Sequence, residues 1–405
     1  MSFRTALSGL NAAQTDLSVT ANNIANANTY GFKQSRAEFA DVFSVSPLGV
    51  GRLQVGAGAR VANVAQQFGQ GTIEFTGNSL DLAVSGNGFF TLSDGGTPVF
   101  TRAGNFGTDR DGYVVNPSGH RLQVFPPNAT GGFDTGRTND LRLALGDNAP
   151  VATTRAEIGT NLPADASVPA VAPFDPNDAE SYNHTTSLTV FDSLGVAHVA
   201  TLYYVKTANP NEWQVSTYID GTAVGGAQTL QYSDSGALTT PATGDITLPG
   251  WVPATGAAPI NLTLNLADST QFGEAFAVNL LSQDGNTTGR LVGLDINAEG
   301  VVFARFTNGR STALGQVAMT AFSNPAGLQK LGDNAWAETF ESGQALRGAA
   351  GSASFGLVQS GALEGSNVEL TEQLVNMIVA QRNFQANAQM ITTQDQVTQA
   401  ALNIR

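Results

Sequence analysis

Both ends of the 405-residue chain carry a long helical pattern, and this feature constrains the fold more than any other. Across residues 3–24, apolar side chains recur at alternating spacings of four and three, the heptad seam of a helix that packs on another helix. The stripe beside this seam is polar but carries almost no charge, since Arg4 and Asp16 are the only charged side chains among the first 30 residues. A helix facing bulk water normally carries Lys and Glu there. The seam comprises Phe3, Leu7, Leu10, Gln14, Leu17, Ala21 and Ile24, and the polar stripe includes Asn11, Asn22 and Asn26.

The last segment of the chain repeats this design. Residues 366–369 read Ser-Asn-Val-Glu, which is the form of a capping box, so a helix is expected to start there. From Leu370 to Arg405 there are eleven Asn or Gln but four charged side chains. At the end of the first helix, Asn28 and Gly31 are expected to release the chain from the helical conformation. The second seam comprises Leu370, Leu374, Met377, Gln381, Phe384, Ala388 and Ile391.

The residues between the two ends predict β-structure. Runs rich in Thr, Val and Phe alternate with turn signals such as Asp111-Gly112, which accept the positive φ of hairpins and favour antiparallel sheets. Pro-rich passages at 163–176 and 241–259 indicate that the middle of the chain is a separate domain. Residues 44–70 are rich in Gly and fit neither a long helix nor a well-patterned strand. The expected fold is therefore mainly β with α-helical termini.

Charge excludes some classes of partner. The net charge is −14, and three of the 19 basic residues are lysines, so no basic patch for nucleic acid is expected. Between residues 145 and 283 there are 13 acids and two bases, which gives −11 (2 − 13) of the total. An acidic middle suits a solvated, outward-facing domain, although drift of surface charge would give the same pattern. No run of 18 apolar residues exists, so no membrane insertion is expected.

The sequence offers little chemistry of its own. The chain has no cysteine, and His120, His184 and His198 lie far apart without the spacing of metal ligands. His198 alternates within a predicted strand and is expected on the surface of a sheet. No Gly-x-Ser-x-Gly elbow or complete phosphate-binding loop is present. We therefore expect neither an enzyme nor a bound cofactor or metal.

The helical ends leave two interpretations open. Both helices could pack on the β domains, with their neutral polar faces a compositional accident. Alternatively, the ends could pair with each other and with copies of themselves, where Asn and Gln exchange amide hydrogen bonds between helices. A heptad seam specifies a partner helix, but it does not say whether that partner belongs to the same chain.

Long motifs then identify a family resemblance. SGLNAAQTDLSVTANNIANANTYGFK at 8–33 closely resembles the amino-terminal motif of the flagellar axial proteins, which include rod, hook and hook–filament junction proteins. ELTEQLVNMIVAQRNFQANAQMITTQDQVTQAALNIR at 369–405 is similar to hook proteins in particular. Inner stretches agree, namely SLDLAVSGNGFF at 79–90, AESYNHTTSLTVFDSLGVAH at 179–198 and GALEGSNVEL at 361–370. The Gly-rich passage 46–60 departs from this pattern by being longer than expected of an enteric-type hook protein.

The resemblance implies a nested, multi-domain architecture. Terminal helices would form an inner α-helical coiled-coil domain lining a channel, followed outward by a connecting region and by antiparallel β-rich inner and outer domains. The expected segments are 1–28 plus 366–405 for the coiled coil, 29–70 plus 358–365 for the connection, 71–144 plus 284–357 for the inner β domain and 145–283 for the acidic outer domain. The seam residues Phe3, Leu7, Leu10, Leu17, Ile24, Leu370, Leu374, Met377, Phe384 and Ile391 would then drive assembly, and Asn11, Asn22 and Asn26 would face other helices or the channel.

The resemblance also implies a structural function. Subunits of this family build a short, curved, hollow tube, the flagellar hook, which transmits motor torque to the filament as a universal joint. The expected partners are further copies of the chain, the hook cap, the distal rod and hook–filament junction proteins, the flagellar type III export apparatus and the hook-length control protein. The expected location is extracellular, after export without a cleaved signal peptide. A distal rod component is the nearest alternative, and a monomeric extracellular β-rich enzyme or adhesin is an alternative from another class.

Overall fold

A computed structural model describes residues 2–42, 56–128, 131–143, 146–352 and 354–403 of the chain. The chain divides into two compact units. Unit 1 comprises residues 1–143, 293–304 and 311–405, and unit 2 comprises 144–292 and 305–310. Unit 2 is thus inserted into the sequence of unit 1, so both ends of the chain fold in the same unit. The Gly-rich passage 46–60 lies largely outside the described residues, although its last residues enter a strand.

Unit 1 contains both helices. Its elements are α1 (Ser2–Ala25), β1 (Ser35–Asp41), β2 (Ala59–Gln66), β3 (Ile73–Phe75), β4 (Leu82–Ser85), β5 (Phe89–Asp94), β6 (Thr97–Thr101), β7 (Gly107–Thr108), β8 (Val114–Val115), β9 (Arg121–Phe125), β10 (Asn139–Asp140), β24 (Ser311–Ala321), η2 (Pro325–Gly327), β25 (Gln329–Gly332), β26 (Ala335–Ala337), β27 (Leu346–Ala349), β28 (Leu357–Ser360), β29 (Ala362–Glu364) and α2 (Leu370–Asn403). Strands β22 (Leu291–Ile296) and β23 (Val301–Phe306) run across the boundary between the units.

Unit 2 is built from strands and one short 3-10 turn among its described residues. Its elements are β11 (Arg155–Pro163), η1 (Ala179–Ser181), β12 (His184–Phe191), β13 (Ala197–Lys206), β14 (Glu212–Ile219), β15 (Thr222–Ala223), β16 (Gln228–Tyr232), β17 (Leu238–Thr240), β18 (Asp245–Thr247), β19 (Thr263–Asn265), β20 (Thr270–Phe272) and β21 (Ala277–Gln283). The prediction of a mainly β fold with helical termini and antiparallel sheets is confirmed.

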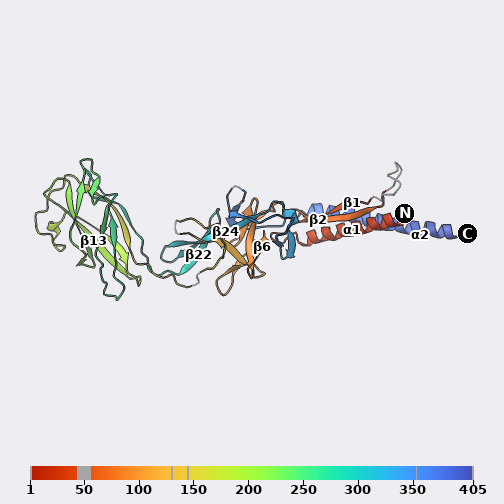
Figure 1. Ribbon diagram of the computed structural model, residues 1–405, viewed down its shortest axis with the longest axis horizontal. Coiled ribbons are helices and arrows are strands. Elements are labelled where there is room, and N and C mark those ends of the chain that lie inside the picture. The colour runs from red at the N-terminus through yellow and green to blue at the C-terminus, as the bar shows by residue number, and fades with distance from the viewer. Residues whose placement is uncertain (1, 43–55, 129–130, 144–145, 353, 404–405) are drawn as a thin grey trace. The chain divides into compact units, whose positions relative to one another are not determined.

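The sheets of unit 1 bring distant parts of the sequence together. The main sheet runs in the order β22-β23-β24-β9-β5-β6-β26-β25. Figure 1 labels three of its strands, β22, β24 and β6. Two further pairs, β28 with β4 and β29 with β3, join the segment before α2 to the first quarter of the chain. Within the main sheet, Phe89 of β5 and Trp336 of β26 pack edge to face with ring centroids 5.8 Å apart. The segment that leads into α2 therefore lies beside strands from the first quarter of the chain.

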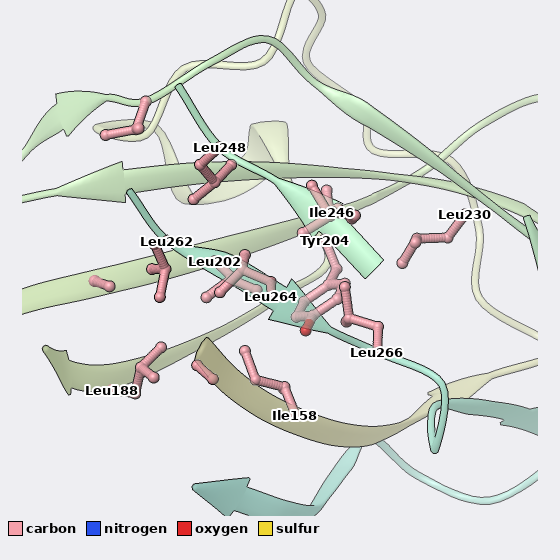
Figure 2. Close-up of a cluster of buried hydrophobic side chains, with 14 of the residues drawn as sticks. Ile158, Leu188, Leu202, Tyr204, Leu230, Ile246, Leu248, Leu262, Leu264 and Leu266 are labelled. Carbon is pink, nitrogen blue, oxygen red and sulfur yellow. The ribbon is translucent and has the colours of Figure 1, made fainter. Parts of the chain in front are cut away.

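Unit 2 has one core shared by two sheets. Strand β13 alternates buried and exposed residues, so that Leu202 and Tyr204 point inward, as the period of two in its sequence predicts. Ile158 and Leu264, from the sheet β18-β19-β11-β20, face them across the core, and Figure 2 shows these side chains meeting. Here β11 pairs in parallel with β19 and β20, an exception to the antiparallel pattern. Roughly a hundred residues separate these partners, enough for the crossover that a parallel pair needs.

Three local expectations were wrong. Helix α2 begins at Leu370 rather than at Ser366, because the Ser366 hydroxyl accepts a hydrogen bond from the Val368 amide, 3.3 Å away. The neighbouring Asn367 side chain is also tied to connecting backbone, since it accepts from the Gln34 amide at 2.8 Å. Residues 59–66, within the passage expected to lack a regular strand, form β2, whose pairing with β1 supplies the order that its Gly-rich surroundings obscured.

His198 is the third correction. It is 6% exposed rather than lying on a sheet surface. Its Nδ1 is 2.7 Å from a carboxylate oxygen of Asp220, and its Nε2 is 3.3 Å from one of Asp192. His198 shares the inward face of β13 with Ala200, Leu202 and Tyr204, so the alternation of the strand itself places this side chain in the interior.

Candidate assembly surface

Helices α1 and α2 pack against each other through small and uncharged residues. Ala6, Ala13 and Thr20 are buried at intervals of seven on α1, and Gln373 and Ala380 repeat that interval on α2. The helices run antiparallel, because Asn23 bonds to Gln373 at one end of the pair while Gly9 lies against Asn387 at the other. Figure 1 shows the two helices side by side, with β1 and β2 along α1. Small side chains allow the helix axes to come close.

The predicted seam residues are less buried than these small residues. Of the ten large apolar residues expected to drive assembly, four are exposed, with fractions of 50% for Phe3, 42% for Leu7, 45% for Leu370 and 50% for Leu374. The other six are half-buried, namely Leu10, Leu17, Ile24, Met377, Phe384 and Ile391. Further large apolar side chains stay exposed on α2, including Val375, Ile378, Val379, Met390 and Val397. A helix pair that leaves this much apolar surface in water has the character of an interaction site.

The predicted polar stripe lies beside this surface. Asn11 and Asn22 are exposed, and Asn26 is half-buried with its Nδ2 donating to the Asn22 carbonyl at 2.9 Å. The amide that joins the two helices belongs instead to Asn23, which sequence reasoning did not single out. Its Nδ2 donates to the Ser35 carbonyl at 2.8 Å and to Gln373 Oε1 at 3.2 Å. Asn22 and Asn23 are adjacent in the sequence, and the motif does not indicate which of the two side chains faces the other helix.

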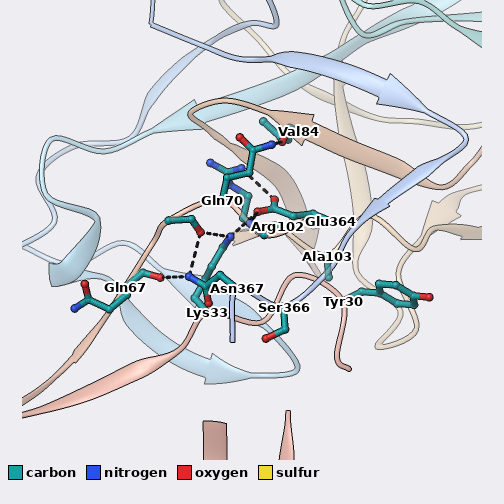
Figure 3. Close-up of polar contacts among 12 residues, drawn as sticks. Tyr30, Lys33, Gln67, Gln70, Val84, Arg102, Ala103, Glu364, Ser366 and Asn367 are labelled. Atoms are coloured by element: carbon teal, nitrogen blue, oxygen red, sulfur yellow. Dashed lines mark hydrogen bonds and ion pairs between the residues drawn. The ribbon is translucent and has the colours of Figure 1, made fainter. Parts of the chain in front are cut away.

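A buried ionic cluster lies where the helical ends join the β-structure. Glu364, the last residue of β29, has a fully buried side chain that forms two ion pairs. Its Oε1 is 2.5 Å from Lys33 Nζ, and its Oε2 is 3.1 Å from a guanidinium nitrogen of Arg102. The same carboxylate also accepts the Gly71 amide at 3.0 Å. Figure 3 shows these groups converging from segments that are hundreds of residues apart in sequence, with Gln70 beside them. The cluster holds the start of the chain, the first β segments and the approach to α2 together.

The cluster holds two cations for one carboxylate. Burial lowers the pKa of Lys33 and of Arg102, and the charge and hydrogen bonds of Glu364 oppose both shifts. Backbone carbonyls add further acceptors, since Lys33 donates to Gly69 at 2.8 Å and Arg102 to Gly86 at 2.8 Å, while the Nε of Arg102 is buried without a partner. Sequence reasoning missed all three charged residues. The available signal was that Lys33 is one of three lysines in the chain and directly follows the helix-ending motif.

The chain reverses direction after α1 at Gly31, a position that requires glycine. It adopts a left-handed φ of +67°, and a Cβ here would collide with the Ala103 backbone. Its amide donates to the Glu364 carbonyl at 2.7 Å, so the chain reversal after α1 is fastened to β29. The expectation that Gly31 redirects the chain agrees with this geometry, although α1 itself ends earlier, at Ala25.

Neither described helix is long and apolar enough to cross a membrane. Within the described residues, His, Asp and Glu side chains do not gather in any group of three that could hold a metal ion.

Four family models match separate segments of the chain. The model described as "Flagella basal body rod protein" matches residues 3–33, and "Flagellar basal body rod FlgEFG protein C-terminal" matches 359–404. Between them, "Flagellar hook protein FlgE/F/G D1 domain" matches 83–169, and "Flagellar basal body protein FlaE D2 domain" matches 161–286.

Individual relatives agree with these models. The flagellar hook protein FlgE of Salmonella typhimurium is 41% identical over 415 residues, covering 100% of both chains, and that of Escherichia coli is 41% identical over 413 residues with the same coverage. The corresponding protein of Borreliella burgdorferi is 35% identical over 100% of this chain and 99% of its own length. The crystal structure of Helicobacter pylori FlgE2 shares the fold, with a TM-score of 0.54 at 16% identity over 72% of this chain and 100% of that chain. From its helical ends to its β domains, this chain belongs to the flagellar hook protein family.

Proposed function

We propose that the chain is the structural subunit of the flagellar hook and polymerises into a curved, hollow tube that transmits motor torque to the filament as a universal joint. The observation that carries this proposal is the apolar surface of the helix pair, on which Phe3, Leu7, Leu370 and Leu374 remain exposed in the single chain. Burying one such side chain contributes about 1.5–3 kcal/mol. Copies of the same helix pair supply the surface that would bury them.

In this proposal the helices form the inner wall and the acidic segment 145–283 faces outward. Neutral Asn and Gln stripes suit a wall that cargo of either charge passes, and the excess of acids keeps an outer surface soluble. The domain limits remain those expected from the sequence, namely 1–28 plus 366–405, 29–70 plus 358–365, 71–144 plus 284–357, and 145–283. Seam residues make the contacts between copies, and Asn11, Asn22 and Asn26 face helices or the channel.

Further partners follow from this position in the flagellum. The tube would meet the distal rod at one end, and the hook cap and then the hook–filament junction proteins at the other. The subunit would reach its extracellular place through the type III export apparatus, with the hook-length control protein ending its growth. Membership of the family supports these partners, and each can be tested by co-purification with the assembled polymer.

The test compares the full chain with versions lacking residues 1–30 or 370–405. We expect the full chain to form curved tubes that sediment and are visible by electron microscopy. Each truncated chain should stay monomeric while its circular dichroism still shows folded β-structure. Polymerisation of a truncated chain would contradict the proposal, and straight, rigid tubes from the full chain would favour a rod component instead.

A further inference from the structure

Asp16 is a half-buried carboxylate that lacks a partner. It lines a crevice of about 410 Å³ between α1, α2 and β1, where its neighbours include the neutral Thr20, Gln373 and Asn376. Two other charged residues, Glu372 and Arg36, line the same crevice, and Arg36 is paired with Glu38 at 3.0 Å. Burial raises the pKa of Asp16, and among the described residues no ion pair or hydrogen bond compensates it. A carboxylate withdrawn from water without a counter-charge costs free energy, and a cation entering the crevice would recover that cost.

Arg382 is the cation that α2 presents on its described surface, and it faces away from α1. Ala380 is fully buried on the contact face of α2, and Arg382 follows it by two residues, which is about 200° around the helix. Arg382 is accordingly exposed, and it forms no ion pair within the described chain. Its guanidinium therefore cannot enter the crevice of its own chain from that side.

The two charges nevertheless stand at nearly the same height along the helix pair. The contacts of Asn23 with Gln373 and of Gly9 with Asn387 set an antiparallel register that places Asp16 level with Ala380. Arg382 lies two residues further on, a difference of about 3 Å along the axis. Arg4, the other described helical cation, is 12 residues from Asp16, or about 18 Å along the axis. A second copy placed alongside at the same height thus brings Arg382 to the crevice, and not Arg4.

We propose that Arg382 of one copy enters the crevice of the next copy and pairs with Asp16, so that this ion pair sets the lateral register of the helix pairs in the polymer. The pairing rests on the proposed function and names the contact by which copies recognise one another. Donor and acceptor lie on different faces of one chain, so the interface is heterologous and continues from copy to copy. The guanidinium also finds amide acceptors in the crevice at Gln373 and Asn376, which satisfy its remaining N–H groups.

Charge reversal tests the pairing in the full chain. Asp16→Arg and Arg382→Asp should each raise the critical concentration for polymerisation at least tenfold, because each places like charges in the contact. The double variant Asp16→Arg/Arg382→Asp should recover most of that loss. Arg4→Gln is the matched control and should polymerise as the wild type does. A double variant no better than the single variants overturns the pairing, provided that circular dichroism shows each of them folded.

Cross-linking gives a second readout that does not depend on restored assembly. Because the chain has no cysteine, Asp16→Cys/Arg382→Cys introduces the only thiols. A short bis-maleimide should link these into covalent oligomers in preformed polymer and should leave dilute monomer unlinked. Linkage within the dilute monomer would overturn the pairing but not the proposed function. The absence of linkage in a polymer that resembles the wild-type polymer would have the same meaning. Failure of the wild-type chain to polymerise under any condition overturns the proposed function and the pairing together.

Discussion

Gly9 of α1 lies against the side chain of Asn387 of α2, and the space between them does not hold a Cβ. We expect Gly9→Leu to force the helices apart and to abolish polymerisation. Gly9→Ala should have a smaller effect, because the better helix propensity of Ala, worth about 1 kcal/mol, offsets the displacement of the Asn387 amide. Sedimentation of the polymer and amide hydrogen exchange across both helices measure these outcomes.

Asn11→Leu is the control for this experiment. It adds the same side chain to α1 at an exposed position two residues away, on a face that α2 does not contact. The control should keep the exchange protection of the helix pair. Equal loss of protection in both variants would contradict the close packing at Gly9.

The buried ionic cluster predicts an asymmetry between its members. Glu364→Gln leaves two buried cations without a carboxylate, so it should lower the free energy of unfolding of unit 1 by about 3–5 kcal/mol. Lys33→Met removes one cation and leaves the pair of Arg102 with Glu364 in place, so its cost should be smaller, about 1–2 kcal/mol.

Fluorescence of Trp336 during urea unfolding measures this difference, because this buried residue belongs to unit 1. Trp213 and Trp251 lie in unit 2 and are replaced by Phe in the reference chain. The surface pair of Arg36 with Glu38 provides the control, since Glu38→Gln at an exposed site should change stability by less than about 1 kcal/mol. Equal losses for Glu364→Gln and Lys33→Met would contradict the imbalance of charge.

The stability of unit 2 should depend on pH through His198. Burial alone would lower the pKa of His198, but the hydrogen bonds and charges of Asp220 and Asp192 raise it above its usual value. Because the pKa is raised in the folded state, protonated His198 stabilises the fold. This contribution is fully present below about pH 6.5 and is lost as the pH rises through the pKa of the folded state. Burial opposes ionisation of Asp192 as well, yet hydrogen bonds, the first from Thr255, hold its pKa at about 2. That contribution is lost as the pH falls below about 4. The combined contribution of His198 and Asp192 to the stability of unit 2 should therefore be largest between about pH 4 and 6.5.

Urea midpoints at pH 5.5 and 8, followed by tryptophan fluorescence, test this dependence, and His198→Gln should flatten it. His184→Gln is the matched control, because burial lowers the pKa of His184 and gives its contribution the opposite sign. A pKa of His198 below 6.5, measured by NMR in the folded chain, would exclude the charged pair.

The exposed seam predicts a change in assembly without a change in folding. Leu374→Ser should leave the unfolding free energy of the monomer within about 0.5 kcal/mol, because this side chain is already in water. The critical concentration for polymerisation should rise roughly 5- to 30-fold, which corresponds to the loss of about 1–2 kcal/mol of burial between copies. Val252→Ser, at a more exposed apolar residue of unit 2, should change neither quantity. Loss of monomer stability in Leu374→Ser would place the residue in an internal contact instead.

Long periodic patterns were read correctly from the sequence, and isolated polar residues were not. The seams from Phe3 and from Leu370 located both helices, because a pattern of seven residues over three heptads averages out local exceptions. The start of α2 was misplaced at Ser366 because a capping box is a motif of only four residues, too short to outweigh contacts from elsewhere in the chain. In the structure the side chain of Asn367 bonds to the backbone of Gln34 and Gln67. Tertiary hydrogen bonds can outweigh a local cap of about 1 kcal/mol.

The sequence by itself determined the class of the protein: helical ends with apolar seams, a β-rich middle and motifs specific to flagellar axial proteins. These depend on periodicity and on contiguous residues, which one chain displays completely. Only the tertiary structure decided that Asn23 rather than Asn22 joins the helices, that small residues are more deeply buried on the helices than the seam residues, and that Lys33, Arg102 and Glu364 share one buried site. Their partners lie up to 350 residues away in sequence, and such contacts follow from how the strands bring the two ends of the chain together.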